Sequence, residues 1–292
     1  MYRTLISTDV LASQSDPSWV VVDCRYDLRD VSWGPAQYRE GHIPGAVYAN
    51  LSHDLAAPPS GTNGRHPLPC VEEMEATFGR LGISNHTQVV AYDQDAGMYA
   101  SRLWWMLRYL GHESAAVLDG GWAKWIREGR PVRAGEEHTP AGTFTGQRRK
   151  EHRVIVDQIA ATLGDPSVLL VDARAPERFE GRNETIDRVA GRIPGAVNHS
   201  YNRNVTEDGV MRPIETLREQ FSETLQGRSP DQVVMYCGSG VTACQNLLAM
   251  EHAGLSGAKL YPGSWSEWSA DPSRPVETGP AGSSKLKVQS TK

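Results

Sequence analysis

The residues best suited to covalent chemistry lie in one short loop, Cys237-Gly-Ser-Gly-Val-Thr-Ala243. A β-branched apolar run ends just before this loop, and a helical pattern begins at about Ala243. Gly238 and Gly240 let the backbone curl so that successive N–H groups point inward, and the following helix adds its own unpaired donors. A cysteine in such a cradle has its thiolate favoured, and the thiolate is the nucleophilic form. We therefore predict that Cys237 is a nucleophile rather than a buried structural thiol, which is the common role of a free cysteine.

Three other cysteine chemistries fit the loop less well. A cysteine phosphatase closes a similar cradle with an arginine that binds phosphate, but the sixth residue after Cys237 is Ala243. A cysteine protease needs a histidine to orient the thiol, and nothing local supplies one. A dithiol oxidoreductase needs a resolving thiol. Cys244 lies seven residues further on, within the helical pattern, where packing is the favoured role.

The elements that position this loop occur twice in the chain. Four motifs recur in the same order about 145 residues later, and both halves close on Arg-Pro-Val. Such a long period indicates a duplicated domain rather than a solenoid. The matching pairs are residues 20–25 with 169–174, 43–47 with 193–197, 89–93 with 233–237, and 120–125 with 263–268.

Short apolar runs alternate with longer helical patterns within the first half. This alternation predicts an α/β fold of two tandem domains, each a parallel sheet with helices on both faces. Ligands bind such sheets outside the carboxyl ends of the strands, which is where Cys237 falls. The predicted strands are residues 20–23, 46–49, 88–93 and 115–119, and the predicted helices are residues 74–82 and 101–111.

The predicted boundaries follow from the repeat. We expect a first domain at residues 1–138, a linker at 139–151, a second domain at 152–278 and a flexible tail at 279–292.

Composition excludes several classes of protein. The chain has 292 residues, of which 39% are hydrophobic, so it is not intrinsically disordered. A net charge of −5 disfavours a nucleic-acid partner. Four cysteines are too few for a disulfide scaffold, and their spacing suits no metal site. No secretory or membrane-spanning segment is recognisable, so we expect a cytoplasmic protein with no membrane partner.

The tandem halves, the repeated Ile-Pro-Gly-Ala-Val, the Gly-x-Trp-x-x-Trp segments and the Cys237 loop resemble the two-domain rhodanese family of sulfurtransferases. The resemblance runs from about Leu5 to Val276. It implies that Cys237 takes a sulfane sulfur from a donor as a persulfide and passes it to cyanide, a small thiol or a protein thiol. A thioredoxin-like protein is one candidate acceptor, and no metal or organic cofactor is implied.

The first half of the chain lacks the nucleophile. Asp93 stands where Cys237 stands in the second half, and a carboxylate cannot form a persulfide. We expect this half to be catalytically silent and to lend side chains to the cleft between the domains.

The loop residues also bear on the sulfur donor. The uncharged segment is similar to that of 3-mercaptopyruvate sulfurtransferases, whereas the thiosulfate enzymes of the family carry cations there for a dianion. The resemblance therefore favours 3-mercaptopyruvate, with thiosulfate as the alternative donor. The loop residues expected to contact the donor are Gly238, Gly240, Val241 and Thr242.

The same relatives hold the donor carboxylate with two arginines. Arg178 matches the first of them. The second has no clean match, so Arg182 and Arg188 are both candidates, and a surface ion pair is the alternative role for each.

The relatives also use a Ser–His–Asp relay that moves protons during C–S cleavage. Ser239 matches the serine, and His66 and Asp54 of the first half resemble the other two members. A solvated loop histidine is the alternative for His66.

Two further carboxylates occupy matched positions, Asp23 and Asp172. Because both halves keep them and only one keeps the cysteine, we expect ion pairs with Arg25 and Arg174 rather than catalysis.

A second hypothesis for the whole chain is a non-catalytic sulfur-relay or docking module, which would not need a reactive thiol.

Overall fold

The computed structural model describes residues 1–14, 16–280 and 285–287 and divides into two compact units. Unit 1 comprises Met1–Ala57, Leu68–Lys150 and Val205–Met211. Unit 2 comprises Pro58–Pro67, Glu151–Asn204 and Arg212–Lys292. Each unit therefore includes a short segment from the other half of the sequence.

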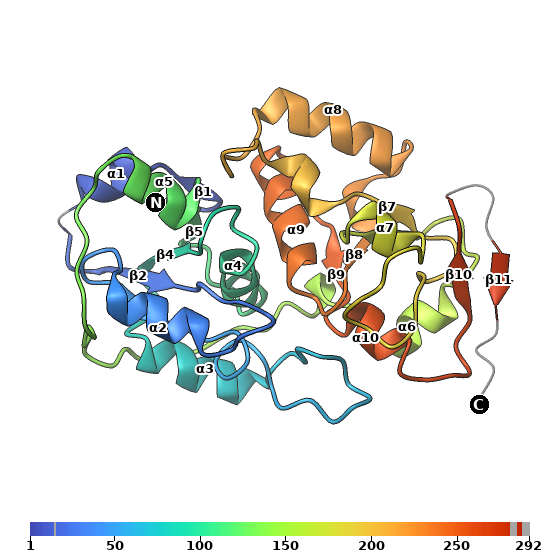
Figure 1. Ribbon diagram of the computed structural model, residues 1–292, viewed down its shortest axis with the longest axis horizontal. Helices are drawn as coiled ribbons and strands as arrows, with labels where there is room; N and C mark the ends of the chain where they lie inside the picture. The colour runs from blue at the N-terminus through green and yellow to red at the C-terminus, as the bar shows by residue number, and fades with distance from the viewer. Residues whose placement is uncertain (15, 281–284, 288–292) are drawn as a thin grey trace. The chain divides into compact units, whose positions relative to one another are not determined.

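Unit 1 is built on a parallel sheet in the order β1-β5-β4-β2-β3. Val, Ala and Leu dominate its central strands, as expected for strands covered on both faces. Helices lie on both sides of the sheet (Figure 1). The strands are β1 (Leu5–Ile6), β2 (Trp19–Asp23), β3 (Val47–Tyr48), β4 (Gln88–Tyr92) and β5 (Ala115–Leu118). The helices are α1 (Thr8–Ala12), α2 (Trp33–Glu40), α3 (Val71–Arg80), α4 (Ala100–Tyr109) and α5 (Gly121–Arg127).

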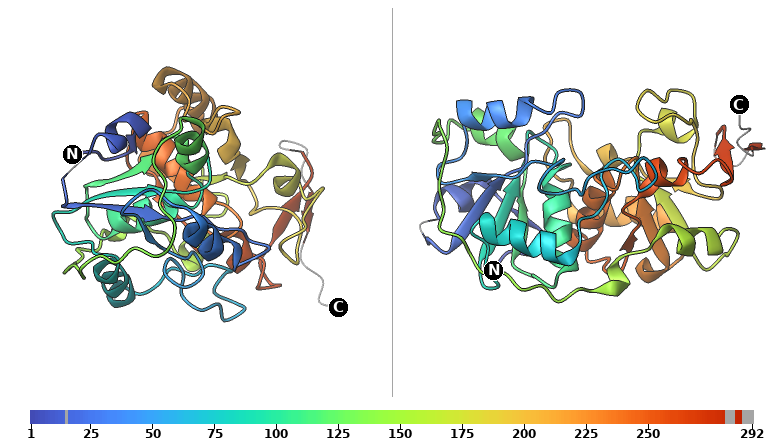
Figure 2. Two further views of the ribbon diagram at one scale, coloured as in Figure 1. Left: turned by 60° about the vertical axis from the view of Figure 1, so that its left-hand side comes forward. Right: turned by 90° about the horizontal axis from the view of Figure 1, so that it is seen from below.

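Unit 2 repeats four of these strands, in the parallel order β7-β6-β8-β9. A separate antiparallel pair follows near the end of the chain (Figure 2). The strands are β6 (Leu169–Asp172), β7 (Val197–Asn198), β8 (Val233–Tyr236), β9 (Lys259–Leu260), β10 (Val276–Thr278) and β11 (Lys285–Lys287). The α-helices are α6 (Val156–Ala161), α7 (Pro176–Phe179), α8 (Ile214–Leu225), α9 (Thr242–His252) and α10 (Ser264–Trp268), with 3₁₀ helices η1 (Lys150–His152), η2 (Tyr201–Asn204) and η3 (Pro230–Gln232).

The predicted α/β fold with two parallel-sheet domains is confirmed. The four predicted strands of the first half correspond to β2, β3, β4 and β5, and the two predicted helices to α3 and α4. Gly82 and Gly111 follow these two helices with φ of 82° and 83°, a conformation that favours glycine at a helix end. The domain boundaries, including the flexible tail, stay predictions, and residues 281–284 and 288–292 of that tail lie outside the described residues.

Matching residues occupy equivalent positions along the strands of the two sheets. Asp23 pairs with Tyr92 across β2 and β4, and Asp172 pairs with Tyr236 across β6 and β8. Asp93 and Cys237 directly follow these two tyrosines, so they leave equivalent strands at equivalent points.

The repeated tryptophan and Arg-Pro-Val motifs form one packed unit in each half. The indole N–H of Trp125 donates to the carbonyl of Pro131 at 2.8 Å, and that of Trp268 donates to the carbonyl of Pro275 at 2.9 Å. Arg130 and Arg274 place their guanidiniums over the same two indole rings. Packing therefore explains this part of the repeat.

The matched carboxylates Asp23 and Asp172 are buried in ion pairs, as predicted. Arg25 lies 2.6 Å from Asp23, and Arg174 lies 2.7 Å from Asp172. All four side chains are buried, so the pairs stabilise the strand ends and do not present a reactive carboxylate.

The expected linker begins as an extended strap on unit 1 (Figure 2). Its backbone N–H groups at Gly142, Gln147 and Arg149 donate to carbonyls of Gly79, Leu110 and Tyr109.

Among the described residues, no helix is long and apolar enough to cross a membrane.

Candidate active site

The Cys237 loop connects β8 to α9 and is held by the start of α10. The carbonyl oxygens of Cys237 and Gly238 accept hydrogen bonds from the N–H groups of Trp265 and Ser266, at 3.0 and 2.9 Å. The N–H of Cys237 donates to Oγ of Ser264 at 3.1 Å. Cys237 itself is 2% exposed. The peptide groups around the thiol are therefore fixed before any substrate arrives.

Two positions in and beside the loop have the left-handed backbone. Gly240 has φ of 71°, and a Cβ there would lie 2.2 Å from the carbonyl oxygen of Pro262, so only glycine fits. Ser264 has φ of 55°, which is unfavourable for a residue with a side chain. The matching residue of unit 1 is Gly121, with φ of 52°. Ser264 therefore bears backbone strain where its hydroxyl contacts Cys237, and sequence reasoning missed it although this Gly-to-Ser difference was visible.

The structure brings His66 and Ser239 together within unit 2. Nδ1 of His66 lies 2.8 Å from Oγ of Ser239, and each residue is 5% exposed. Gly64 has φ of 90°, and a Cβ there would lie 2.9 Å from the carbonyl oxygen of Gly263. This close approach, together with a 3.0 Å hydrogen bond from the N–H of Arg65 to Oγ of Ser266, seats residues 58–67 beside the loop.

The third expected member of the relay lies in unit 1. The carboxylate of Asp54 pairs with Arg80 and accepts a hydrogen bond from the N–H of Asn50 at 2.7 Å. The role of Asp54 in a relay stays a prediction.

Arg178 lies beside the loop within a buried cluster of charges. Its Nε donates to both oxygens of Glu184 at 3.1 Å, and its Nη2 lies 2.9 Å from Asp187. Burial acts to raise the pKa of the Glu184 carboxyl, but hydrogen bonds from Arg178 and from backbone N–H groups hold the pKa below its ordinary value. The guanidinium is therefore held in place by two carboxylates.

The structure does not bring the other two candidate arginines into this cluster. The Arg182 side chain is 59% exposed and pairs with Glu180. Arg188 is exposed, and no hydrogen bond or ion pair of its side chain is found among the described residues. Their roles stay predictions. Sequence reasoning missed Arg65 and Asp187, which meet through a fold-dependent contact between distant segments.

The matching loop of unit 1 is filled by its own carboxylate. Asp93 accepts hydrogen bonds from the N–H groups of Gly97, Tyr99 and Ala100 at 2.9, 2.6 and 3.1 Å. Burial raises the pKa of the Asp93 carboxyl to about 6, against the opposing effect of these donors. In unit 1 the backbone N–H groups of the loop thus bind the carboxyl group of Asp93, whereas in unit 2 the equivalent chain position carries the thiol of Cys237.

We predict that Asp93→Asn destabilises the protein by about 1–3 kcal/mol at pH 7, because an amide N–H₂ would face backbone donors. Since the native pKa of about 6 exceeds the ordinary value of 3.8, the folded state binds this proton more tightly than the unfolded state. The contribution of Asp93 to stability therefore falls as the pH rises through 4 to 6. Urea unfolding across this range should show that slope in the parent protein and not in the variant.

Asp208→Asn serves as the matched control, because its side chain is 75% exposed in the same unit. Equal pH slopes for the parent protein and Asp93→Asn would contradict the prediction.

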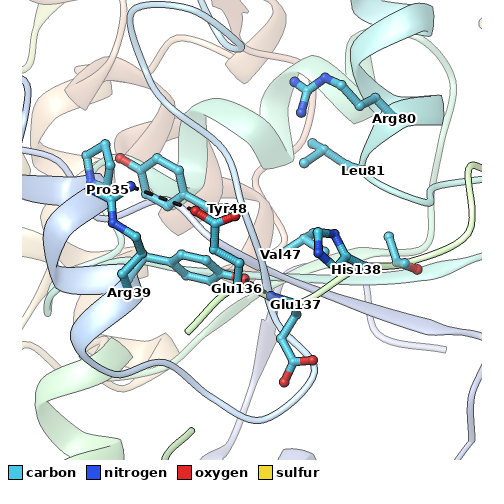
Figure 3. A pocket seen from close by; sticks show the side chains of 11 residues that line it. Pro35, Arg39, Val47, Tyr48, Arg80, Leu81, Glu136, Glu137 and His138 are labelled. Atoms are coloured by element: carbon cyan, nitrogen blue, oxygen red, sulfur yellow. Dashed lines mark hydrogen bonds and ion pairs between the residues drawn. The ribbon is translucent and has the colours of Figure 1, made fainter. Parts of the chain in front are cut away.

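A pocket of about 260 Å³ lies elsewhere in unit 1 (Figure 3). It is lined by charged side chains that include Arg39 and Glu136, which pair with each other at 3.9 Å. It contains no cysteine, so it offers no route to a persulfide. No group of three metal-ligating side chains is found in the part of the chain that the structure describes.

The strand-end cysteine loop and the duplicated parallel sheets agree with comparisons to known proteins. A family model described as a rhodanese-like domain matches residues 7–128 and 156–271. The chain therefore belongs to the rhodanese family and carries two copies of its domain.

Individual relatives are sulfurtransferases. The chain is 45% identical to a protein of Pseudomonas aeruginosa named probable 3-mercaptopyruvate sulfurtransferase, over 95% of this chain and 98% of that protein. It is 35% identical to a thiosulfate sulfurtransferase of Gallus gallus, over 82% of this chain and 84% of that protein. The solved structure of 3-mercaptopyruvate sulfurtransferase from Leishmania major has a TM-score of 0.82 and 32% identity, covering 91% of this chain and 74% of that one. The chain is thus an enzyme of the sulfurtransferase class.

Proposed function

We propose that this enzyme transfers sulfur from 3-mercaptopyruvate, through a persulfide on Cys237, to a thiol or cyanide. The observation that carries the proposal is the neutral Cys237 loop beside Arg178, with Ser239 of this loop hydrogen-bonded to His66. The relative from Pseudomonas aeruginosa supports this choice of donor.

The charges around the loop favour a donor with one negative charge. Residues 238–242 contribute no cation, and the guanidinium of Arg178 is already shared by Glu184 and Asp187. A dianion such as thiosulfate would meet Glu184 and Asp187, whose charges already offset those of the guanidiniums of Arg178 and Arg65. A monocarboxylate needs only a directed contact with a guanidinium.

The proposed chemistry needs a nucleophile and a source of a proton. The Cys237 thiolate attacks the donor sulfur, and the C–S bond breaks with its electron pair passing into the enolate of pyruvate. The donor sulfur stays on Cys237 as the persulfide, and the enolate carbon takes up a proton. His66, hydrogen-bonded to Ser239, is the proposed proton source.

The persulfide is then consumed by a thiophilic acceptor. We propose that a thioredoxin-like dithiol protein is one acceptor, because a second thiol can release the transferred sulfur as hydrogen sulfide. We also propose a cytoplasmic location, where reducing conditions keep the four cysteines as thiols. None of the four described cysteines forms a disulfide in the structure.

Donor kinetics test the proposal. With cyanide as acceptor, we expect kcat/KM for 3-mercaptopyruvate to exceed that for thiosulfate by about tenfold or more, the ratio that one charge-assisted hydrogen bond supports. The reverse preference would establish a thiosulfate sulfurtransferase that uses the same persulfide. If intact mass shows no added sulfur with either donor, the proposed persulfide on Cys237 is contradicted.

A further inference from the structure

Hydrogen bonds hold the peptide groups on both sides of the Cα atom of Cys237. The carbonyl oxygen of Tyr236, in the preceding peptide, accepts from the N–H of Ala173 at 2.8 Å. The carbonyl oxygen of Cys237 accepts from the N–H of Trp265 at 3.0 Å. The N–H of Cys237 donates to Oγ of Ser264 at 3.1 Å. Together these three bonds fix the backbone of Cys237, and the backbone sets the direction of its Cα–Cβ bond.

Unit 1 contains the counterparts of two of these bonds. The N–H of Cys24 donates to the carbonyl oxygen of Tyr92 at 2.7 Å, and the N–H of Trp122 donates to that of Asp93 at 2.8 Å. The third bond comes from a side chain, and the matching position of unit 1 is Gly121, which has none. The serine therefore adds one contact, and it does so in the unit whose loop carries the thiol.

This contact is kept against backbone strain. Ser264 has φ of 55°, in the left-handed region that glycine adopts freely and residues with a side chain do not. Its side chain is fully buried, and its hydroxyl donates to the carbonyl oxygen of Tyr261 at 2.9 Å while accepting from Cys237. Strained residues of this kind cluster at functional sites.

The two loops are shaped differently at this position. In unit 1 a Cβ at Gly121 would lie 2.7 Å from the carbonyl oxygen of Asp93, so the backbone there excludes a side chain. Unit 2 accommodates the side chain of Ser264 at the matching place. The exchange of glycine for serine is therefore part of the difference between the silent loop and the loop that carries the thiol.

We propose that Ser264 is a positioning residue for sulfur transfer, whose hydroxyl holds the backbone of Cys237 so that the thiol points toward the donor sulfur. The inference rests on the proposed function, because it takes Cys237 as the nucleophile. Misplacement of a reacting group by about 1 Å can lower a rate by about a hundredfold, so one hydrogen bond at this peptide can control the rate of sulfur loading. Since Ser264 acts on the nucleophile and not on the donor, its effect should be equal for different donors.

Two substitutions separate the hydroxyl from the strain. Ser264→Gly removes both, and Ser264→Ala removes only the hydroxyl. We expect the rate constant for sulfur loading at saturating donor to fall about tenfold or more in both variants, with 3-mercaptopyruvate and with thiosulfate alike. The donor concentration for half-maximal loading should stay within about twofold of the parent value. Intact mass at short times after mixing with donor measures both quantities.

Thermal unfolding supplies the readout that a merely structural role would not satisfy. Ser264→Gly should unfold about 2 °C or more above Ser264→Ala, because glycine relieves the strain. The loading rate should nevertheless be low in both variants, so that rate and stability do not change in parallel.

Ser269→Ala is the matched control. Ser269 follows α10, and its hydroxyl donates to the carbonyl oxygen of Trp265 at 2.7 Å. This substitution removes a side-chain hydrogen bond from the other end of the same helix. It should leave the loading rate unchanged.

Loading rates equal to that of the parent in both Ser264 variants would overturn the inference. A loss confined to Ser264→Ala would also overturn it, because the effect would then come from strain and not from the hydroxyl. A parent protein that loads no sulfur from either donor would instead overturn the proposed function. In that case amide hydrogen exchange at Cys237, which needs no donor, still decides whether Ser264 fixes this peptide. Exchange should be about tenfold or more faster in both variants, and equal exchange would contradict the inference.

Discussion

Cys237→Ser will abolish sulfur loading and reduce sulfur transfer by at least about a thousandfold, as expected when the nucleophile of a covalent mechanism is removed. Serine preserves the size of the side chain, and the contacts of Cys237 through its N–H and carbonyl groups do not involve sulfur. The fold should therefore persist while the persulfide cannot form. Intact mass after donor treatment should show one added sulfur in the parent protein and none in the variant.

Cys70→Ser is the control for this experiment. Cys70 is exposed and accepts a hydrogen bond from the N–H of Glu73 at the start of α3, a role that serine performs well. This variant should load sulfur normally. A mass gain that survives in Cys237→Ser would show that another thiol carries the sulfur and would reject the proposed site.

His66→Asn will lower kcat with 3-mercaptopyruvate by about a hundredfold, the lower end of the range for loss of a general acid. The pyruvate enolate requires a proton, whereas sulfite leaves thiosulfate as a stable anion. Turnover with thiosulfate should therefore fall much less. Steady-state kinetics with both donors, over a range of pH, measures this difference.

Ser239→Ala supplies the partner variant for a double-mutant cycle. Because Nδ1 of His66 and Oγ of Ser239 are 2.8 Å apart, the losses in the two single variants should not add in the double variant. Equal losses with both donors would indicate that His66 only supports the loop, and additive losses would indicate that the two residues act separately.

The fold was predictable because the sequence contains it twice. Apolar runs such as residues 20–23 and 88–93 are short, β-branched and bounded by polar residues, which favours buried parallel strands. The repeated Gly-x-Trp-x-x-Trp segments were predictable as packing elements, since both copies bond to the Arg-Pro-Val that follows them.

The candidate site was predictable only where local sequence determines geometry. The glycines of the Cys237 loop can be read from the sequence. Glycine is required at position 240 because a Cβ there would lie too close to the carbonyl oxygen of Pro262. The convergence of Arg65 with Asp187 depends on how residues 58–67 pack, which no local pattern encodes. The role of Ser264 was missed although the Gly-to-Ser difference between the halves was visible, because its contact with Cys237 joins the start of α10 to the end of β8.

Because residues 58–67 belong to unit 2, the two halves of the gene do not correspond to two independent units. A gene fragment that encodes only the second half would keep the cysteine but lose both Arg65 and His66. Deletion of the first half of the chain, which lacks the nucleophile, would therefore remove these two side chains from beside the Cys237 loop. The first half of the sequence therefore contributes ten residues, 58–67, to the unit that carries Cys237.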